Sequence, residues 1–582
     1  MATYADRPWT RNYDPSVPKT IDYPEIPVYT LLDNAARDFP NNNALVTSAH
    51  LPLFGRKSAA VSYKLLGELT DRLAAALANM GVKKGDRVAI VAPNSAQFVI
   101  AFFGILKAGG IVVALNPTFP PAKWADQLND AGVETVITMT LFYKGLNSIR
   151  GETPIKQMIV TNYKEYLPPL GQTLFTLARE KKDGHYVESL QANDFWLQDV
   201  LARFTPDQRP AITINPREDT AIFQYTGGTT GVPKAARGPH YALVANATQM
   251  QAWISGGLSA GTSSSMGAIP FFHVYGMVAV VVFSVIMGAP IFLVPNARDI
   301  NDVLGVISTF KPTHFMGVPA LYNAINQHPD VKAGKVDLGS IKACISGSAP
   351  LAPETKRKFE ELTGGIVMEG FGMSEAPTAT HCNPYQGVNK VGSIGLPFPD
   401  VECRIISLDD GKTDMPVGEV GELVMRGPVM MTGYHNMPTE TANALRDLDR
   451  DGRPWLFTGD IARMDEEGYF YIVDRKKDMV LIGGFNVYPN NVEKVLMEHP
   501  AIAEAAVAGI PHPEKEGQEA LKAWVVLKPG AEVTQEALIE HCKTRMAPYE
   551  VPRRIDFMTE LPKTAVGKIL RRELVKLETQ TA

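Results

Sequence analysis

The sequence has few cysteines and no block of charge of one sign. Its 582 residues include four cysteines that are widely scattered and form no CxxC pair: Cys344, Cys382, Cys403 and Cys542. This pattern indicates neither a zinc site nor a disulfide framework, and it favours a reducing compartment, the cytoplasm. The formal net charge is -5, without a long run of Lys or Arg. Nucleic acid is therefore not an expected partner.

Long apolar segments are also scarce. The first 29 residues are polar, aromatic and rich in proline. They lack the apolar stretch of a secretory signal and predict an extended arm lying on the surface. The exception is segment 277–294, because about 18 apolar residues are enough to span a membrane. Since Gly288 and Pro290 divide this segment, we predict a buried helix followed by a buried strand.

Helical and strand patterns alternate through most of the chain. Segments 65–80 and 95–107 have helical periodicity, whereas 87–92 and 111–115 are short apolar runs typical of buried strands. Together they predict a βαβ unit with parallel strands. Similar apolar runs recur at 134–138, 221–225, 291–294, 341–346 and 366–369. The pattern predicts an α/β fold in which a large N-terminal domain, residues 1–474, contains parallel sheets with helices.

Two changes of pattern divide the C-terminal part of the chain. From about Val401, short β-prone runs are separated by Gly and Asp, which predicts an antiparallel β subdomain over about 400–474. After Asp474, helix and strand patterns alternate over about a hundred residues, enough for a separate α+β domain. We place the boundary near Arg475–Asp478 and predict a small C-terminal domain, residues 475–582.

A glycine-rich segment, YTGGTTGVPK at Tyr225–Lys234, follows a predicted strand. Such a turn lets backbone N–H groups approach phosphate oxygens, while hydroxyl groups and a lysine add donors and charge. It is not the Walker pattern, because the lysine follows proline and precedes Ala235. A lone glycine-rich turn is usually only a loop, but this composition at the end of a strand favours phosphate binding. The candidate residues are Thr226, Gly227, Gly228, Thr229, Thr230, Gly231 and Lys234.

Two other segments each follow an apolar strand: ISGSAPL at 345–351 and EGFGMSE at 369–375. We expect both to form loops at the carboxyl ends of a parallel sheet, where such folds bind ligands. Further motifs occur along the chain as PFFHVYGM (270–277), WLFTGDIAR (455–463), YIVDRKKD (471–478) and LPKTAVGKILRREL (561–574).

In this order the motifs resemble those of the adenylate-forming superfamily, which includes acyl-CoA synthetases, firefly-type luciferases and peptide-synthetase adenylation domains. The resemblance covers nearly the whole chain. The sequence as a whole is most similar to those of medium- to long-chain fatty acyl-CoA synthetases. Ala235 and Ser374 depart from the common pattern, in which glycine and threonine are usual at these positions.

The resemblance implies a nucleotide site. It assigns adenine binding to Gly347, Ser348, Ala349 and the segment Glu369, Gly370, Phe371, Gly372 and Met373, with Phe371 offering an aromatic face. Ser374 would contact the α-phosphate, and Thr226 and Glu375 would bind magnesium, a hard cation that prefers oxygen ligands. Asp460 and Arg475 would bind the ribose hydroxyl groups.

The resemblance also assigns residues to catalysis and domain movement. Lys568 matches the catalytic lysine, whose ammonium would stabilise the charge that develops on phosphorus; Lys563 is the local rival. His273 matches a residue that borders the acyl site, although a lone histidine beside aromatic residues is equally often part of a core. Lys477 matches the hinge about which the small domain turns. Gly483 and Gly484 would let the pantetheine arm of coenzyme A approach closely.

These assignments predict an ATP-dependent fatty acid:CoA ligase that uses ATP, Mg²⁺ and coenzyme A. The acid would first become an acyl-adenylate with release of pyrophosphate, and thiol attack would then give acyl-CoA and AMP. An aryl-CoA ligase, or an acyl-AMP ligase serving a carrier protein, is an alternative within the same chemistry. A nucleotide-binding protein without catalysis is an alternative of another class. Peripheral contact with a membrane is also open, because fatty substrates partition into bilayers.

Overall fold

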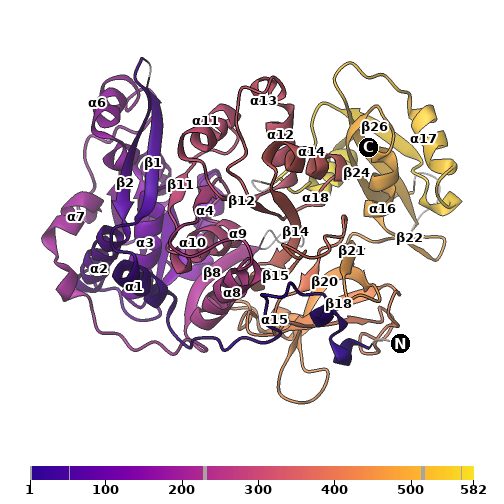
Figure 1. Cartoon of the computed structure of the whole chain (residues 1–582), viewed down its shortest axis with the longest axis horizontal. Coiled ribbons are helices and arrows are strands. Elements are labelled where there is room, and N and C mark those ends of the chain that lie inside the picture. The colour runs from indigo at the N-terminus through magenta and orange to yellow at the C-terminus, as the bar shows by residue number, and fades with distance from the viewer. Residues whose placement is uncertain (1–2, 52, 227–232, 513–517, 565–566, 582) are drawn as a thin grey trace. The chain divides into compact units, whose positions relative to one another are not determined.

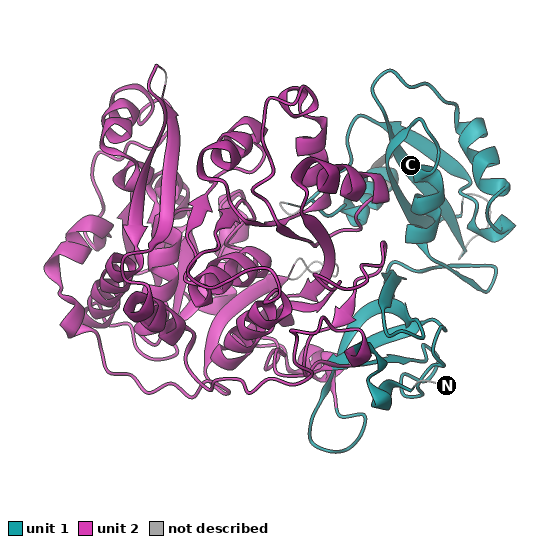
Figure 2. Ribbon diagram, viewed as in Figure 1, with its two compact units in different colours: residues 1–9, 403–425, 447–582 teal, residues 10–402, 426–446 magenta. Residues whose placement is uncertain are grey.

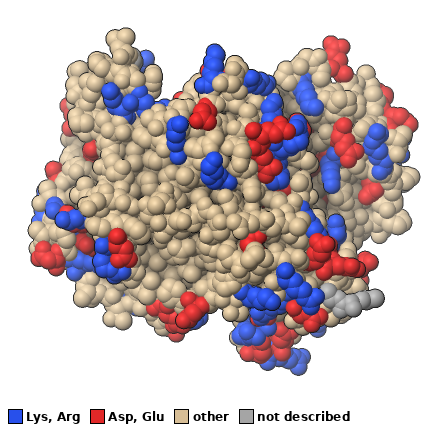
Figure 3. Space-filling view, in the orientation of Figure 1, with Lys and Arg blue, Asp and Glu red and all other residues tan. Residues whose placement is uncertain are grey.

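The computed structural model describes residues 3–51, 53–226, 233–512, 518–564 and 567–581. The chain forms two compact units (Figures 1 and 2). The larger unit comprises Thr10–Glu402 and Arg426–Arg446, and the smaller unit comprises Met1–Trp9, Cys403–Met425 and Asp447–Ala582. Basic and acidic side chains are interspersed on the face seen in Figure 3, as expected for a chain with a small net charge.

A seven-stranded sheet of the larger unit contains the predicted βαβ unit. Its strands, in spatial order, are β7 (Asp194–Trp196), β6 (Gln157–Thr161), β5 (Thr135–Met139), β3 (Arg87–Val91), β4 (Ile111–Ala114), β8 (Thr220–Thr226) and β9 (Lys234–Pro239). Strands β3 and β4 are parallel and are joined by α3 (Ala96–Lys107), which is buried along its whole length. The Ser95 side chain begins α3 by accepting a hydrogen bond from the Phe98 amide at 3.2 Å. The βαβ prediction is confirmed.

A nine-stranded sheet forms the rest of the core of this unit. Its order is β16 (Leu396–Pro397), β15 (Ala376–Cys382), β14 (Ile366–Met373), β13 (Ala343–Ser346), β12 (His314–Gly317), β10 (Ser265–Gly267), β11 (Ile291–Leu293), β1 (Asn43–Leu51) and β2 (Gly55–Ser62). The central strands from β14 to β1 pair in parallel. The carboxyl ends of β13 and β14, which carry two predicted motifs, therefore lie side by side.

Helices cover the sheets of the larger unit. They include α1 (Val28–Asp38), α2 (Tyr63–Asn79), α4 (Pro121–Ala131), α5 (Thr140–Ser148), α6 (Pro169–Ala178), α7 (Leu197–Arg203), α8 (His240–Trp253), α11 (Ile300–Phe310), α12 (Pro319–Gln327), α13 (Pro329–Lys332), α14 (Pro353–Thr363) and α15 (Pro438–Ala444). Side chains of α11, α12 and α14 pack with strands β12 to β14 in one buried apolar cluster. This packing fixes the strand ends that carry the candidate site.

The apolar segment 277–294 folds as predicted, into buried helix followed by buried strand. α9 (Val274–Gly276), a π-helical turn at Met277–Val282 and α10 (Phe283–Ile286) run on without a break, and β11 follows. Gly288 has φ of +57° between helix and strand, a backbone conformation that suits glycine. In the described part of the chain, no helix combines the length and the apolar character needed to cross a membrane.

The N-terminal segment is anchored more firmly than the predicted surface arm. Within the smaller unit, Trp9 is only 1% exposed and its ring packs edge-on against Phe470 at 6.0 Å. Within the larger unit, the Tyr13 hydroxyl donates to the Pro397 carbonyl at 2.7 Å. The prediction of an arm lying on the surface is wrong for these aromatic residues, because burying their rings removes a large apolar area from water.

The smaller unit combines antiparallel β structure with a C-terminal α+β part. Strands β18 (Gly421–Arg426), β20 (Trp455–Met464) and β21 (Phe470–Arg475) pair antiparallel. β17 (Glu402–Ile406) belongs to the same five-stranded sheet, whose remaining strand, β19 (Leu445–Arg446), consists of residues of the larger unit. The α+β part contains β22 (Val480–Ile482), β23 (Phe485–Val487), α16 (Pro489–Met497), β24 (Ile502–Pro511), β25 (Glu519–Leu527), α17 (Gln535–Lys543), β26 (Arg554–Met558) and α18 (Arg571–Thr581). The α/β class with a C-terminal α+β part is confirmed. The predicted boundary near Arg475 lies inside this unit, at the end of β21, and stays a prediction.

Candidate active site

The predicted phosphate-binding segment lies between two paired strands. β8 and β9 run antiparallel, and their last pair joins Thr226 to Lys234. Gly227, Gly228, Thr229, Thr230 and Gly231 lie outside the described residues. Strand pairing therefore fixes both ends of the segment, and it holds the two described candidates, Thr226 and Lys234, opposite each other.

Two residues that sequence reasoning missed contact the candidate phosphate and metal side chains. The Lys234 ammonium forms an ion pair with Glu440 in the first turn of α15 and lies 5.5 Å from the centre of the Tyr434 ring. The Tyr434 hydroxyl donates to the Glu375 carboxylate at 2.8 Å. Burial and the Glu375 charge both raise the pKa of Tyr434, so the hydroxyl keeps its proton and acts as a donor. Tyr434 thus links Lys234 to Glu375.

The motif after β13 forms a loop, as predicted. The Gly347 amide donates to the Gly317 carbonyl at 3.2 Å, and Ser348 has φ of +71°, which turns the chain sharply. Below this loop, the Tyr275 hydroxyl donates to the Ile345 carbonyl at 2.7 Å. Gly347, Ser348 and Ala349 therefore lie at the carboxyl end of the sheet.

The second motif is a strand, not the predicted loop. β14 continues through Met373, because it pairs in parallel with β13 up to Glu369 and then antiparallel with β15 from Gly370. Sequence reasoning missed this extension because β15, the new partner, follows only after the turn at Ser374 and Glu375. The candidate adenine residues therefore lie along an ordered strand instead of a free loop.

The side chains of Glu369 and Phe371 on β14 both have partners in the fold. The Glu369 side chain accepts a hydrogen bond from the Gly392 amide at 2.8 Å, and burial raises its pKa to about 7. The Phe371 ring is half-buried and lies edge-on to His381 at 5.8 Å. The carboxyl group of Glu369 therefore has a structural partner, the Gly392 amide, while the Phe371 ring remains partly exposed.

His273 caps a helix. Its Nδ1 atom accepts a hydrogen bond from the Tyr275 amide at 3.2 Å at the beginning of α9. Burial lowers the pKa of His273 to about 4, so the imidazole is neutral near pH 7 and Nδ1 can act as an acceptor. This contact gives the residue a structural role, and its position beside an acyl group stays a prediction.

Asp460 and Arg475 form an ion pair in the smaller unit. They lie opposite each other on β20 and β21, with the Arg475 Nε atom 3.0 Å from the Asp460 Oδ1 atom. The Asp460 side chain is 2% exposed, and its Oδ2 atom is buried without a hydrogen-bond partner in the described structure. Burial raises the pKa of Asp460, and the Arg475 charge opposes that rise. An acceptor of this kind suits a hydroxyl donor, which is what a ribose would provide.

Lys568 lies within electrostatic range of that pair. Surrounding protein, together with the charges of Arg475 and Lys477, lowers the pKa of Lys568 from 10.5 to about 8, and Asp460 opposes this shift. The residue nonetheless keeps an exposed surface. The pKa of Lys568 therefore lies below the ordinary lysine value.

The rival lysine and the remaining candidates lie nearby in the smaller unit. Lys563 is paired with Glu504 at 2.5 Å, which leaves Lys568 as the better candidate for catalysis. Lys477 lies in the turn after β21. Gly483 and Gly484 join β22 to β23 with φ of +58° and +88°, and a β-carbon at either position would meet no atom within 4 Å. Space for a close approach therefore exists at both glycines.

Comparison with known proteins identifies the family. Residues 32–435 match the AMP-binding enzyme family, and residues 491–568 match the AMP-binding enzyme C-terminal domain. The chain belongs to the AMP-binding enzyme family. It is 40% identical over 578 residues to a long-chain-fatty-acid–CoA ligase of Bacillus subtilis and 35% identical over 576 residues to one of Yersinia pestis, with 99% and 98%, respectively, of both chains covered.

Solved structures of similar fold include enzymes that are named for different acids. ATP-bound MatB of Rhodopseudomonas palustris is 25% identical with a TM-score of 0.79, covering 96% of this chain and 100% of that one. A fatty acyl CoA synthetase of Mycobacterium tuberculosis is 26% identical with a TM-score of 0.70, covering 95% and 99%. An anthranilate CoA ligase in complex with anthranoyl-AMP is 27% identical with a TM-score of 0.78, covering 96% and 98%. The resemblance to adenylate-forming enzymes is confirmed.

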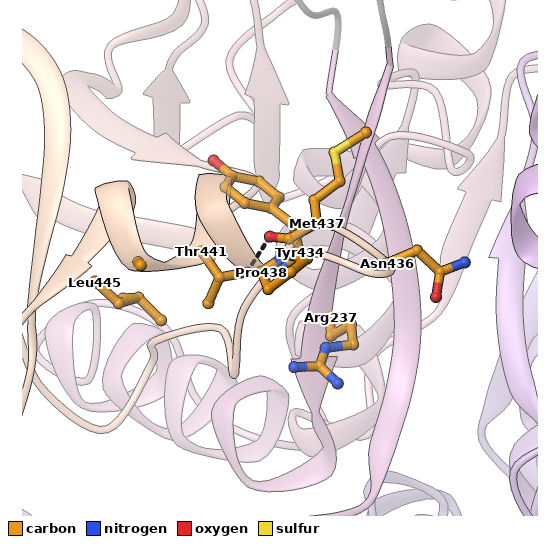
Figure 4. Close-up of a pocket in the computed structure, with 8 residues that line it drawn as sticks. Arg237, Tyr434, Asn436, Met437, Pro438, Thr441 and Leu445 are labelled. Carbon is orange, nitrogen blue, oxygen red and sulfur yellow. Dashed lines mark hydrogen bonds between the residues drawn. The ribbon is translucent and has the colours of Figure 1, made fainter.

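This AMP-binding enzyme also has a surface pocket next to Tyr434 (Figure 4). Its volume is about 400 Å³, and its lining comes from β9 and the segment around α15: Arg237, Tyr434, Asn436, Met437, Pro438, Thr441, Ala442 and Leu445. The Thr441 hydroxyl donates to the Met437 carbonyl at 2.9 Å. The pocket shares only Tyr434 with the contacts around Lys234 and Glu375.

Proposed function

We propose that this chain is an ATP-dependent ligase that joins a long-chain fatty acid to coenzyme A, with AMP and pyrophosphate as the other products. The observation that carries the proposal is the buried acceptor atom of Asp460, with Arg475 and Lys568 around it. The Asp460 carboxylate suits the ribose hydroxyl groups of a nucleotide, and the nearby cations suit its phosphate charge. Curated relatives named long-chain-fatty-acid–CoA ligase, similar over nearly the full chain, support the choice of acid and thiol.

The reaction proceeds in two steps that balance. A carboxylate oxygen of the acid bonds to the α-phosphorus of ATP, and the bond from that phosphorus to the bridging oxygen breaks, releasing pyrophosphate. The coenzyme A sulfur then bonds to the acyl carbon, AMP leaves with the oxygen, and the thiol proton goes to solvent. The first step is needed because a carboxylate by itself is a poor acylating agent.

Charged side chains of this protein act on the first step. Lys568 stabilises the negative charge that gathers around the α-phosphorus, an interaction stronger in the transition state than in the ground state. Lys234 attracts the phosphate chain. Asp460 accepts from the ribose hydroxyl groups, and Ser374 contacts the α-phosphate.

Magnesium is the cation that we propose for Glu375 and Thr226. A carboxylate offers about four acceptor positions, and the Tyr434 hydroxyl uses one of those of Glu375. Mg²⁺ usually takes only one or two protein carboxylates and fills its other positions with water and substrate phosphates. The donor set therefore fits this ion. When bound, the ion neutralises phosphate charge.

For the second step we propose that residues 475–582 turn about Lys477. This movement withdraws Lys568 and brings the turn at Gly483 and Gly484 to the thiol. Two observations support this proposal. Residues 491–568, which match the AMP-binding enzyme C-terminal domain, lie in the α+β part of the chain, and both glycines have open space around them.

The acid and the cellular location are supported by sequence more than by fold. Structures of similar fold include an anthranilate ligase and a benzoate ligase, so the fold alone does not select the acid. The four cysteines are buried, in keeping with the proposed cytoplasmic location. Transient membrane contact is proposed only for uptake of a substrate that partitions into lipid.

The test is ATP–pyrophosphate exchange with a panel of acids, followed by product analysis with and without coenzyme A. We expect long-chain fatty acids to support exchange better than short-chain or aromatic acids, and thioester to form only with coenzyme A. Preference for aromatic acids favours an aryl-CoA ligase. Exchange without CoA-dependent thioester favours a carrier-protein ligase, and no exchange with any acid favours a binding protein.

A further inference from the structure

One arginine at the beginning of α18 holds together both sides of the proposed hinge. Arg571 makes a two-pronged ion pair with Glu493 of α16, at 2.8 and 2.9 Å. Its NH1 atom lies 3.2 Å from the Asp478 carboxylate and 3.5 Å from the Asp474 carboxylate. Asp474 belongs to β21, before Lys477, whereas Asp478 follows Lys477. We call these four residues and Asn490 the Arg571 cluster.

On strand β21, the Asp474 side chain is the group that α16 and Arg571 contact. It is fully buried, and it accepts a hydrogen bond from the Asn490 amide at 2.8 Å. The Asn490 side-chain amide donates to the Val473 carbonyl at 3.1 Å, and its oxygen accepts from Arg571. The beginning of α16 is thus bonded to β21 directly as well as through Arg571.

The cluster contains three carboxylates, those of Asp474, Asp478 and Glu493, around one guanidinium. Burial raises the pKa of both Asp474 and Glu493, and the Arg571 charge opposes each rise. A buried carboxylate without its cation is costly. Arg571 is therefore the residue on which the cluster depends, and lysine replaces it poorly because an ammonium lacks the planar, two-pronged donor geometry.

We propose that Arg571 is a positioning residue that holds the C-terminal α+β part in the arrangement that brings Lys568 near Asp460, and that this cluster must open for the thioester step. The proposal rests on the two-step function proposed above. The arrangement described here is the one with Lys568 near the Asp460–Arg475 pair. A turn about Lys477 changes the backbone between Asp474 and Asp478, so the contacts of Arg571 cannot all survive it.

The test compares Arg571→Ala with Arg571→Lys and with Arg572→Ala, a matched control at the exposed neighbouring arginine. We expect Arg571→Ala to lower kcat/KM for ATP–pyrophosphate exchange by about tenfold, a typical size for coupling between two states. Thioester formation from preformed acyl-adenylate should stay within about twofold or become faster. Arg571→Lys should be intermediate, and Arg572→Ala should match the wild type. Equal losses in both half-reactions, or none in either, overturn the proposal.

Limited trypsin digestion gives a readout that does not depend on activity. We expect cleavage after Arg475, Lys476 or Lys477, mapped by mass spectrometry, to be faster in Arg571→Ala than in wild type or Arg572→Ala. Unchanged cleavage contradicts the cluster's role even if no acid supports exchange, so the two proposals can fail separately. If Arg571→Ala does not fold, Asp478→Asn decides, because it removes one partly exposed contact. It should shift the ratio of half-reactions in the same direction but less, and an unchanged ratio overturns the proposal.

Discussion

In the proposed mechanism, Lys568 is the side chain whose charge matters most to the first half-reaction. Lys568→Ala should slow adenylation by about 10²- to 10³-fold, the usual cost of removing one electrostatic contact to a transition state. Thioester formation from preformed acyl-adenylate should fall far less, because the phosphorus chemistry is then complete. Single-turnover measurements of each half-reaction check this. Lys563→Ala is the matched control, and equal losses in both half-reactions of Lys568→Ala would contradict the assignment.

The lowered pKa of Lys568 gives adenylation a pH dependence. The protonated ammonium is the active form, so activity is complete below the pKa of the folded protein and falls as pH rises through it. That pKa is about 8, below the ordinary value, so kcat/KM for ATP should decline from about pH 8 upward. Lys568→Arg keeps its charge and should give a flat profile over this range. A decline that persists in Lys568→Arg would assign the titration to another group.

Glu440 competes with phosphate for Lys234. The two side chains are paired, with exposures of 19% and 43%, so in the proposed site the ATP phosphates compete with the carboxylate. An exposed pair of this kind contributes about 0.2–1 kcal/mol, so Glu440→Gln should tighten ATP binding by about fivefold at most. Calorimetry with a non-hydrolysable ATP analogue measures this. Glu419→Gln, an exposed glutamate elsewhere, should change nothing, and weaker binding by Glu440→Gln would show that Glu440 orients Lys234 for ATP.

At the scale of elements, strand β14 depends on a glycine. A β-carbon at Gly372 would lie 1.5 Å from the Thr378 carbonyl oxygen of β15, a distance that no side chain can accept. Gly372→Ala should therefore separate the two strands and cost about 1–3 kcal/mol of unfolding free energy, with weaker nucleotide binding. Denaturant unfolding measures the loss. Gly151→Ala is the control, because a β-carbon there meets nothing within 4 Å. Equal stability of the two variants would show that the strand ends shift freely.

The sequence was sufficient to predict elements with local patterns but not contacts between distant segments. The helix of residues 96–107 and its flanking strands follow from apolar periodicity. The extension of β14 does not, because its second half gains a partner only after the chain has turned back. Tyr434 and Glu440 lie about two hundred residues from Lys234 in sequence, and no spacing signal joins them. Backbone hydrogen bonds between β9 and the segment 432–435, which precedes α15, bring them together.

At the scale of the whole molecule, the residues of one reaction come from segments that are far apart. Asp460, Arg475 and Lys568 meet in the smaller unit, and their motifs could be recognised from the sequence because each is a short run with its own composition. Asp474, Asp478 and Arg571 also lie in recognised motifs, at 471–478 and 561–574. Their association with Glu493 was missed, because no spacing signal in the sequence joins these segments. Burial beside Arg571 distinguishes Asp474 and Glu493 from ordinary surface carboxylates, because it raises the pKa of both.

If the small domain turns about Lys477, a substitution that stiffens this position should slow the thioester step, whereas Arg571→Ala should slow adenylation. Lys477→Pro fixes φ near about −65° and should hinder rotation, so thioester formation should fall by about tenfold or more while adenylation changes little. Rapid-quench measurements of both half-reactions check this, with Lys477→Ala as the control for loss of the charge alone. Unchanged thioester kinetics would exclude rotation about this residue. General destabilisation would lower the rates of both half-reactions in each variant. Selective loss of the thioester step in Lys477→Pro and of adenylation in Arg571→Ala is instead what two alternating arrangements predict.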